Sequence, residues 1–188
     1  MKHDYIVLIV GKSGTGKSTI CGYLEADYGV KELRSYTTRP KRGADDNSHI
    51  FVSDEEFDSL DGIVAYTEYN GYRYCATEKQ IEECDTYIID PDGVDYFLKA
   101  YTGKKIPMVV YIATPESIRG RRMAYRGQSD DEIKNRLELD AQVFRNIEDY
   151  ATIKYVNSDV ALIDVMEICD NIYDTFFREE SDEYRRED

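Results

Sequence analysis

The sequence contains few of the residues that build metal centres, disulfide scaffolds or membrane spans. Its 188 residues include no tryptophan, two histidines and four cysteines, and no two cysteines form a C-x-x-C pair. A zinc site with the usual ligand spacing is therefore excluded, and we expect reduced thiols that fill space. No apolar run reaches the roughly 20 residues of a membrane-spanning helix. Because a strand-like run begins close to the N-terminus, we expect no secretory signal and a cytoplasmic location.

Positive charge is also scarce. The chain has 24 lysines and arginines against 38 aspartates and glutamates, which gives a net charge of -14. This balance excludes extended binding to nucleic acid, because such binding neutralises phosphates along a basic face. Two local basic clusters nevertheless indicate phosphate handling, since guanidinium groups pair with two phosphate oxygens at once. The first cluster holds Arg34, Arg39, Lys41 and Arg42, and the second holds Arg119, Arg121, Arg122 and Arg126, with Arg136 beyond it.

Apolar runs that alternate with helical patterns predict an α/β domain. The continuous β-branched run Tyr5–Val10 is typical of a strand that is buried on both faces of a parallel sheet. Further strands of this kind are predicted at 87–89, 108–112 and 153–156. Helices are predicted from Lys17 onward and over 94–101, 116–123, 131–150 and 160–177. This order predicts three layers, with helices on both faces of a parallel central sheet.

The stretch 35–83 interrupts that alternation. Segments 66–69 and 72–74 alternate around Asn70-Gly71, and this pattern predicts a hairpin in a small inserted antiparallel lobe. We therefore expect a single domain over 1–188. Its predicted parts are a core at about 1–34, 84–117 and 137–177, an acceptor-binding lobe at 35–83, a helical lid at 118–136 and a charged tail at 178–188.

Residues 11–18, Gly-Lys-Ser-Gly-Thr-Gly-Lys-Ser, fit the phosphate-binding pattern G-x-x-x-x-G-K-[ST]. The glycines allow backbone amides to surround phosphate oxygens, Lys17 reaches the β- and γ-phosphates, and the Ser18 hydroxyl ligates Mg²⁺. The motif predicts a nucleoside triphosphate site but leaves GTPases, ATPases and small-molecule kinases open. The predicted ATP-binding residues here are Gly11, Ser13, Gly14, Thr15, Gly16, Lys17, Ser18 and Thr19.

A carboxylate follows the predicted strand 87–89. Asp90 is placed to hold a magnesium-bound water beside Ser18, as phosphoryl-transfer enzymes require. The same residue, next to Pro91, also suits a turn at the end of a strand. Both interpretations of Asp90 stay open from the sequence.

Residues 35–43, Ser-Tyr-Thr-Thr-Arg-Pro-Lys-Arg-Gly, followed by Phe-Val-Ser at 51–53, closely resemble the acceptor-binding segment of guanylate kinases. The likeness covers roughly residues 5 to 175, including the hairpin lobe, Arg-Gly-Gln at 126–128 and Val-Asn-Ser-Asp at 156–159. It implies a P-loop kinase that transfers the γ-phosphate of ATP, with Mg²⁺, to a nucleoside or deoxynucleoside monophosphate, which is GMP or dGMP by resemblance.

The same resemblance implies roles for the matching residues. Catalytic roles fall on Lys17, Arg39, Asp90, Arg122, Arg126 and Arg136. The acceptor nucleotide is expected at Ser35, Arg39, Arg42, His49, Ala65, Tyr74, Ala76 and Asp92, and the ATP adenine near Asn157.

The acceptor site departs from the family pattern. Ala65 and Ala76 stand where the family has a guanine-reading Glu and a Ser or Thr, Cys75 replaces a glycine, and His49 replaces a phosphate-binding tyrosine. Loss of such a hydrogen-bonding carboxylate changes base discrimination by orders of magnitude. Glu68 is expected on the opposite face of the hairpin from Ala65. The acceptor base and sugar therefore stay open.

Two alternatives remain beside the nucleoside monophosphate kinase. One is a kinase of the same fold with another acceptor, either a different nucleotide or a phosphorylated sugar. The other is a non-catalytic module that binds a phosphorylated peptide, against which the intact Lys17 and the lid arginines argue. We expect a monomer or homodimer with small-molecule nucleotides as partners, and neither nucleic acid nor membrane.

Overall fold

Strand β1 (Tyr5–Val10) lies at the centre of a five-stranded sheet with the order β2-β7-β1-β8-β9. Every neighbouring pair in this sheet is parallel. The partners of β1 are β2 (Glu32–Leu33), β7 (Thr86–Ile88), β8 (Ile106–Ala113) and β9 (Ile153–Val156). The predicted parallel central sheet is therefore confirmed, although β2 had no recognisable pattern in the sequence.

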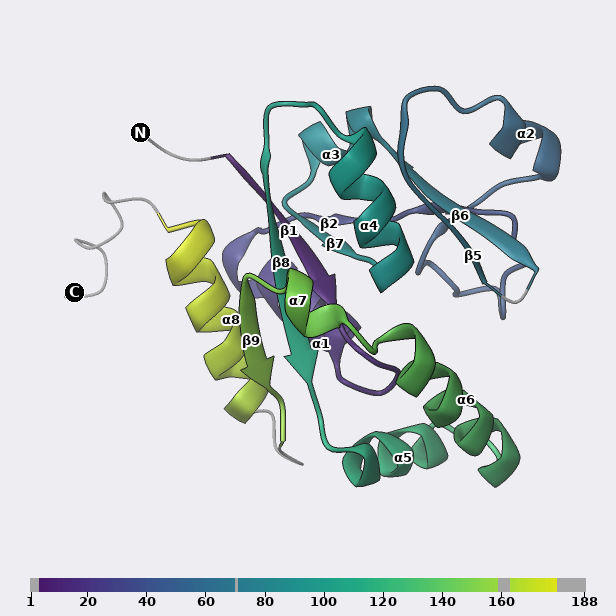
Figure 1. Cartoon of the computed structure of the whole chain (residues 1–188), viewed down its shortest axis with the longest axis vertical. Helices are drawn as coiled ribbons and strands as arrows, with labels where there is room; N and C mark the ends of the chain where they lie inside the picture. The colour runs from purple at the N-terminus through teal and green to yellow at the C-terminus, as the bar shows by residue number, and fades with distance from the viewer. Residues whose placement is uncertain (1–3, 70, 159–162, 179–188) are drawn as a thin grey trace.

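The computed structural model describes residues 4–69, 71–158 and 163–178. Figure 1 shows helices on both faces of the central sheet. On one face, α1 (Lys17–Tyr28) and α8 (Ile163–Phe176) pack against Val7 and Ile9. On the other face, Ile6 and Leu8 pack in one core cluster with residues of α3 (Glu78–Glu83), α4 (Pro91–Ala100) and α7 (Ile147–Tyr150). Alternate residues of β1 thus enter two separate cores, which confirms the three-layer fold.

The inserted lobe contains a second sheet of four strands in the order β4-β3-β6-β5. Its strands are β3 (Tyr36–Thr37), β4 (Ile50–Phe51), β5 (Ile63–Tyr69) and β6 (Tyr72–Thr77), with α2 (Asp54–Asp58) beside them. The predicted hairpin is present, because β5 and β6 pair antiparallel and Tyr69 lies opposite Tyr72. Asn70 lies outside the described residues. The short β4 joins β3 in parallel, whereas β3 and β6 are antiparallel.

The segment predicted as a lid, 118–136, falls within α5 (Glu116–Tyr125) and α6 (Asp130–Val143), which lie together below the core in Figure 1 and are called the lid helices below. The prediction of one helix over 131–150 was wrong. A turn at 144–146 ends α6, and the chain continues in the separate α7. This turn allows Ile147, which is 2% exposed, to enter the core cluster against which Phe144 also packs.

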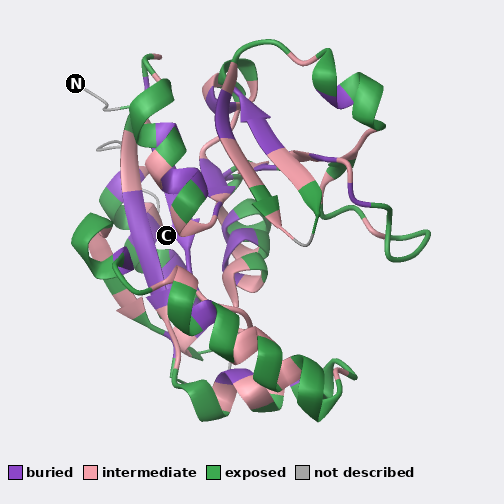
Figure 2. Cartoon of the chain, turned by 45° about the vertical axis from the view of Figure 1, so that its right-hand side comes forward, coloured by how far each residue is buried: buried purple, intermediate pink, exposed green. Residues whose placement is uncertain are grey.

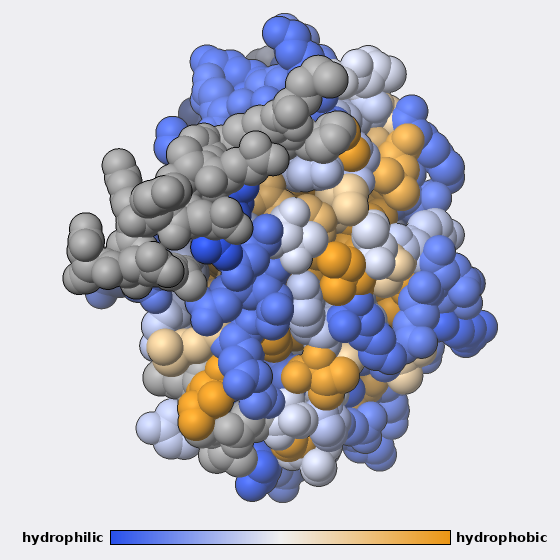
Figure 3. All heavy atoms as spheres, turned by 90° about the vertical axis from the view of Figure 1, so that its left-hand side faces the viewer, coloured by the Kyte–Doolittle hydropathy of each residue, from blue (hydrophilic) through white to orange (hydrophobic). Residues whose placement is uncertain are grey.

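The central strands and the lid helices differ clearly in how far their residues are buried. Figure 2 shows buried strands at the centre and mostly exposed lid helices. The side of the molecule that carries α8, seen in Figure 3, intersperses apolar with hydrophilic side chains. In the described ranges, no helix is both long and apolar enough to cross a membrane. The predicted charged tail lies outside the described residues, apart from Arg178.

The core cluster beneath α4 gives a test of the packing. Phe97 is fully buried and stacks on Tyr101 with 4.8 Å between ring centroids, whereas its neighbour Leu98 is 45% exposed. We expect Phe97→Ala to lower the free energy of unfolding by about 3–5 kcal/mol, because it leaves a cavity. Leu98→Ala should change it by less than about 0.5 kcal/mol. Urea unfolding of both variants measures this difference, and equal effects would contradict the packing described.

Candidate functional site

The phosphate-binding motif forms a tight loop between β1 and α1. Gly14 and Gly16 have φ values of 80° and 94°, in the left-handed region that favours glycine. A Cβ on Gly16 would lie 2.8 Å from Nδ2 of Asn157, and one on Gly14 would lie 3.0 Å from the carbonyl oxygen of Arg119. The loop therefore requires glycine at both positions, both for its backbone angles and for the approach of its neighbours.

The side chain of Lys17 folds back over this loop. Its Nζ donates hydrogen bonds to the carbonyl oxygens of Gly11 at 2.6 Å and Lys12 at 3.2 Å. Burial lowers the pKa of Lys17 to about 8, although the nearby carboxylate of Asp140 opposes that shift. The ammonium group is thus still charged at neutral pH and lies at the loop where phosphates would bind.

The carboxylate of Asp140, on α6, bonds directly to the loop. It accepts hydrogen bonds from the backbone N–H of Ser13 at 2.9 Å and from the Ser13 hydroxyl at 3.2 Å. It also pairs with Nη1 of Arg119 at 2.8 Å. Asp140 and Arg119 are only 7% and 2% exposed, so this is a buried ion pair between α5 and α6, and its carboxylate also bonds to the P-loop. This contact could not be predicted from the sequence.

Two predicted arginines and the predicted asparagine also reach the loop. Arg122 donates to the carbonyl oxygen of Gly14 and to Oδ1 of Asn157, each at 3.2 Å. Asn157 donates from Nδ2 to the carbonyl oxygen of Thr15 at 2.8 Å. The Nε of Arg136 donates to the hydroxyl of Ser13 at 3.0 Å. These contacts gather lid and core side chains around the P-loop.

The remaining residues predicted to bind ATP or to act on it, Arg126, Ser18 and Thr19, lie at or near the P-loop. Arg126 follows the last residue of α5 and is exposed, yet its charge contributes to lowering the pKa of Lys17. The N–H of Thr19 bonds to the carbonyl oxygen of Gly16 in the first turn of α1, and Ser18 beside it is exposed. The hydroxyl of Ser18 is therefore accessible from outside the loop.

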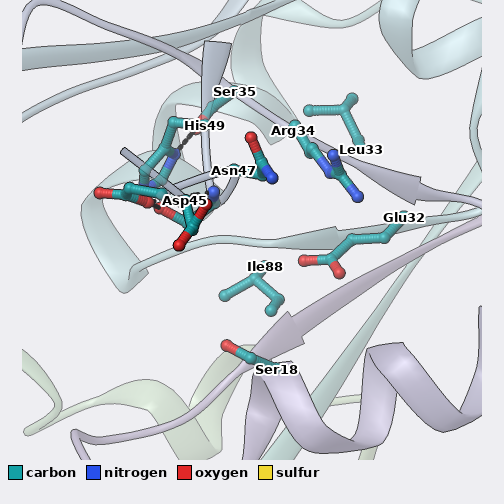
Figure 4. A pocket seen from close by; sticks show the side chains of 11 residues that line it. Ser18, Glu32, Leu33, Arg34, Ser35, Asp45, Asn47, His49 and Ile88 are labelled. Carbon is teal, nitrogen blue, oxygen red and sulfur yellow. Dashed lines mark hydrogen bonds between the residues drawn. The ribbon is translucent and has the colours of Figure 1, made fainter. Parts of the chain in front are cut away.

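A cavity of about 490 Å³ lies between the start of α1 and the inserted lobe (Figure 4). Ser18 and Ile88 line one side, and residues of β2, the following segment and the loop at 45–49 line the other. Its full lining is Ser18, Glu32, Leu33, Arg34, Ser35, Asp45, Asp46, Asn47, Ser48, His49 and Ile88. The predicted metal ligand Ser18 and the predicted acceptor residues Ser35 and His49 thus face one space.

Three predicted acceptor residues form a cluster in the lobe. The hydroxyl of Ser35 and Nδ1 of His49 are hydrogen-bonded at 2.9 Å. The rings of His49 and Tyr74 meet edge to face with 5.4 Å between centroids. Burial, helped by the charge of Arg39, lowers the pKa of His49 to about 4. His49 is therefore neutral at pH 7 and can act only as a neutral hydrogen-bonding group.

The predicted residue Arg39 is held by its own loop. Its Nη2 pairs with Oδ2 of Asp46 at 3.1 Å, and its guanidinium lies 5.1 Å from the centroid of the Phe51 ring. Asp46 also accepts from Ser48 and from the backbone N–H of Arg42. These hydrogen bonds, led by that of the Ser48 hydroxyl, keep the pKa of Asp46 well below its usual range. The side chain of Arg42 is exposed.

Asp90 does not line the cavity that contains Ser18. Its carboxylate accepts from the N–H of Gly93 at 2.7 Å and caps α4. It also bonds to the side chain of Thr67 in the lobe, while burial raises its pKa. Asp92 is exposed in the first turn of α4. The structure thus places Asp90 between the core and the lobe, where it organises a helix start.

A different carboxylate lines the cavity. Glu32 belongs to the edge strand β2, and burial raises its pKa to about 7 against the opposing charge of Arg34. The sequence did not mark this residue, because a two-residue strand has no alternation to read. Within the described ranges, no three His, Cys, Asp or Glu side chains converge into a metal-binding group.

The two alanines at the predicted base-reading positions face each other. Ala65 lies opposite Ala76 in the pairing of β5 and β6, and both are fully buried in the core cluster that includes Tyr87. The register shift falls between Ile63 and Ala65, so pairing is regular from Ala65 to the turn. Glu68, three residues on, therefore lies on the other face, as expected. Cys75, next to Ala76, is also fully buried.

Comparisons with known proteins agree on the fold. A family model described as an AAA domain matches residues 7–152. No curated protein sequence matches the chain. Among solved structures, the guanylate kinase from Anaplasma phagocytophilum superposes with a TM-score of 0.62 at 21% sequence identity, covering 93% of this chain and 86% of that one. The chain thus has the P-loop fold of that guanylate kinase.

The ion pair of Asp140 with Arg119 provides a first test of the site. Asp140→Ala leaves a buried guanidinium without its partner, and breaking such a pair costs about 3–5 kcal/mol. We expect a lower melting temperature and weaker binding of a non-hydrolysable ATP analogue, because the Ser13 contact is lost as well. Glu138→Ala, an exposed residue of the same helix, is the matched control. Unchanged melting and binding in Asp140→Ala would contradict the proposed support of the loop.

The pKa of Lys17 predicts a pH dependence. Only the protonated amine attracts phosphate, and its pKa in the free protein is about 8. The affinity for the ATP analogue should therefore be constant below that pH and fall about tenfold for each pH unit above it. Calorimetric titration on either side of pH 8 measures this slope. In Lys17→Met the slope should vanish, and a wild-type affinity that stays flat above pH 8 would contradict the assignment.

Proposed function

The chain belongs to the AAA domain family, and from its P-loop fold and cavity we propose that it is an ATP-dependent nucleoside monophosphate kinase. The observation that carries the proposal is the cavity itself. Ser18 of the P-loop lines it on one side, and Ser35 and His49 of the lobe line it on the other. A donor triphosphate on the P-loop and an acceptor phosphate on the lobe would meet in this space.

The donor side would act mainly by neutralising charge. Phosphoryl transfer needs positioning and electrostatic stabilisation rather than covalent chemistry from the protein. Lys17 and the lid residues Arg122, Arg126 and Arg136 would surround the transferring phosphoryl group, and Asn157 would hold the P-loop backbone near the nucleotide. Closure of the lid would keep water from competing as the acceptor.

The lobe would bind the acceptor. We propose that Ser35, Arg39, Arg42, His49 and Tyr74 hold its phosphate, with Asp90 and Asp92 toward the nucleoside. Arg39 would exchange the carboxylate of Asp46 for a phosphate oxygen, since both are anions that suit a guanidinium. The phosphate oxygen of the acceptor would then attack the γ-phosphorus of ATP in line, the bond from that phosphorus to the β–γ bridging oxygen would break, and ADP would leave.

Magnesium fits the donor side of the cavity. The exposed hydroxyl of Ser18 is an oxygen ligand of the kind that Mg²⁺ prefers, and it stands at the start of α1 beside the loop. Bound together with ATP, the ion would neutralise negative charge on the β- and γ-phosphates. The residues of this chain would fix the nucleotide and exclude water around it.

Guanine nucleotides are the first acceptors to test, because a guanylate kinase is among the structural neighbours. Ala65 and Ala76 offer no side-chain hydrogen bond to a base, however. This pair of methyl groups favours a second candidate, a kinase of the same fold with a different nucleotide or a phosphorylated sugar as acceptor. A non-catalytic phosphopeptide-binding module would have no use for the P-loop lysine and the arginines around it.

An acceptor panel tests the proposal. ADP production from ATP should rise with at least one nucleoside or deoxynucleoside monophosphate. Lys17→Ala and Arg136→Ala should each keep the fold and lower turnover by about 10²–10³-fold, because each removes a charge from the transition state. Lys99→Ala, an exposed lysine of α4, is the control. If Lys17→Ala turned over as fast as the wild type, the proposed mechanism would be contradicted.

We also propose a cellular compartment and an oligomeric state for this protein. The four cysteines, all within the described residues, are unpaired thiols, which suits a reducing compartment such as the cytoplasm. We propose a monomer or homodimer that uses small-molecule nucleotides and needs neither nucleic acid nor membrane.

A further inference from the structure

Glu32 is the carboxylate that shares the cavity with Ser18. It lies in β2, which pairs in parallel with β7 in the central sheet, so its backbone is fixed by the core. Figure 4 shows its carboxylate directed into the cavity, with the hydroxyl of Ser18 entering the same space from the start of α1. The two oxygen-bearing groups come from different elements and face one volume.

The carboxylate of Glu32 has no partner in the described part of the chain. No hydrogen bond reaches it there, and no basic group lies within ion-pair distance. Arg34 and Glu25 act on it only through longer-range charge. A half-buried carboxylate without a partner is costly, because burial removes water without a replacement. A cation bound in the cavity would compensate for this cost.

Of the other carboxylates near the cavity, Asp46 and Asp90 are already engaged, and Asp45 lines the cavity from the loop at 45–49 of the lobe. Asp46 is bonded to Arg39 and Ser48. Asp90 caps α4 and bonds to Thr67, and it does not line the cavity. The role that the sequence suggested for Asp90 beside Ser18 is therefore open to Glu32.

Resting on the proposed function, we infer that Glu32 acts with Ser18 to hold the divalent cation of the bound metal–ATP complex, as a ligand of the ion or of its waters. Carboxylate and hydroxyl oxygens suit a hard cation such as Mg²⁺. Two protein oxygens are too few to bind the ion alone, so phosphate oxygens and water complete its coordination. The protein therefore gains affinity for the cation only when the nucleotide is present.

Electron paramagnetic resonance of Mn²⁺ tests the inference without relying on turnover. Free Mn²⁺ is measured in titrations of the protein saturated with a non-hydrolysable ATP analogue. We expect Glu32→Gln to weaken Mn²⁺ binding in this complex by about 10–100-fold, the usual loss when a supporting residue of a metal site is removed. Binding of the analogue without metal should be unchanged, because Gln keeps the shape and removes only the charge.

Three further variants separate the roles. Ser18→Ala should weaken Mn²⁺ binding as Glu32→Gln does, whereas Asp90→Asn should not. Glu25→Gln is the matched control, since this exposed carboxylate contributes to the potential at Glu32 but does not line the cavity. Thermal unfolding of each variant with the analogue bound checks that the fold is intact, and Glu32→Asp replaces Glu32→Gln if that variant unfolds.

The outcomes distinguish the inference from the proposed function. Equal Mn²⁺ affinity in the wild type and Glu32→Gln, with normal analogue binding, overturns the inference and leaves the kinase proposal intact. A loss in Asp90→Asn but not in Glu32→Gln also overturns it. If the wild type binds the analogue neither with nor without metal, the proposed function fails and the inference fails with it.

Discussion

The carboxylate of Asp140 joins the lid to the P-loop, and the arrangement of the donor side depends on this contact. It holds the amide and hydroxyl of Ser13 and pairs with the buried Arg119. Arg136, one helical turn earlier on α6, is thereby placed against the same serine. The lid and the loop thus form one hydrogen-bonded unit at the end of the sheet, and an anion bound there would meet charges already held in position.

This unit shows how a chain with a net charge of -14 can still gather positive charge at one place. The negative charge of Asp140 compensates the positive charge of Arg119, and this pairing allows both charged groups to remain buried near the loop. Arg136 bonds to the hydroxyl of Ser13, a neutral oxygen, so this contact does not neutralise its charge. On the lobe side, Asp46 balances Arg39. The acidic balance of the whole chain therefore says little about the local potential at the cavity.

The core of the fold could be predicted because its elements are long and periodic. The buried run of β1, the glycine motif and the start of α1 follow one another in an order that few folds allow. The two-residue strands β2, β3 and β4 could not be predicted, since so short a segment shows no alternation. The break between α6 and α7 was missed because both segments have helical spacing, and only the packing of Ile147 in the core requires the turn.

The residues of the candidate site also divide into those that could be predicted from the sequence and those that could not. Residues in a contiguous motif, such as Lys17 and Ser18, were predicted from the sequence alone. Asp140 and Glu32 were not, because a single carboxylate on a helix or a short strand looks like any surface charge in so acidic a chain. Their burial and their neighbours come from segments far apart in sequence. For Asp90 the sequence left two interpretations open, and the structure shows the helix cap directly.

Binding of a bisubstrate analogue tests the central claim most directly. In such a compound, adenosine is joined through a polyphosphate chain to a second nucleoside, and calorimetry measures its affinity and stoichiometry. If the P-loop and the lobe bind the two halves across one cavity, at least one such analogue should bind at a ratio of one to one. It should do so about 10²-fold more tightly than ATP, because the second half binds without a further loss of freedom. If every analogue binds no more tightly than ATP, the cavity does not join a donor site to a nucleotide acceptor site.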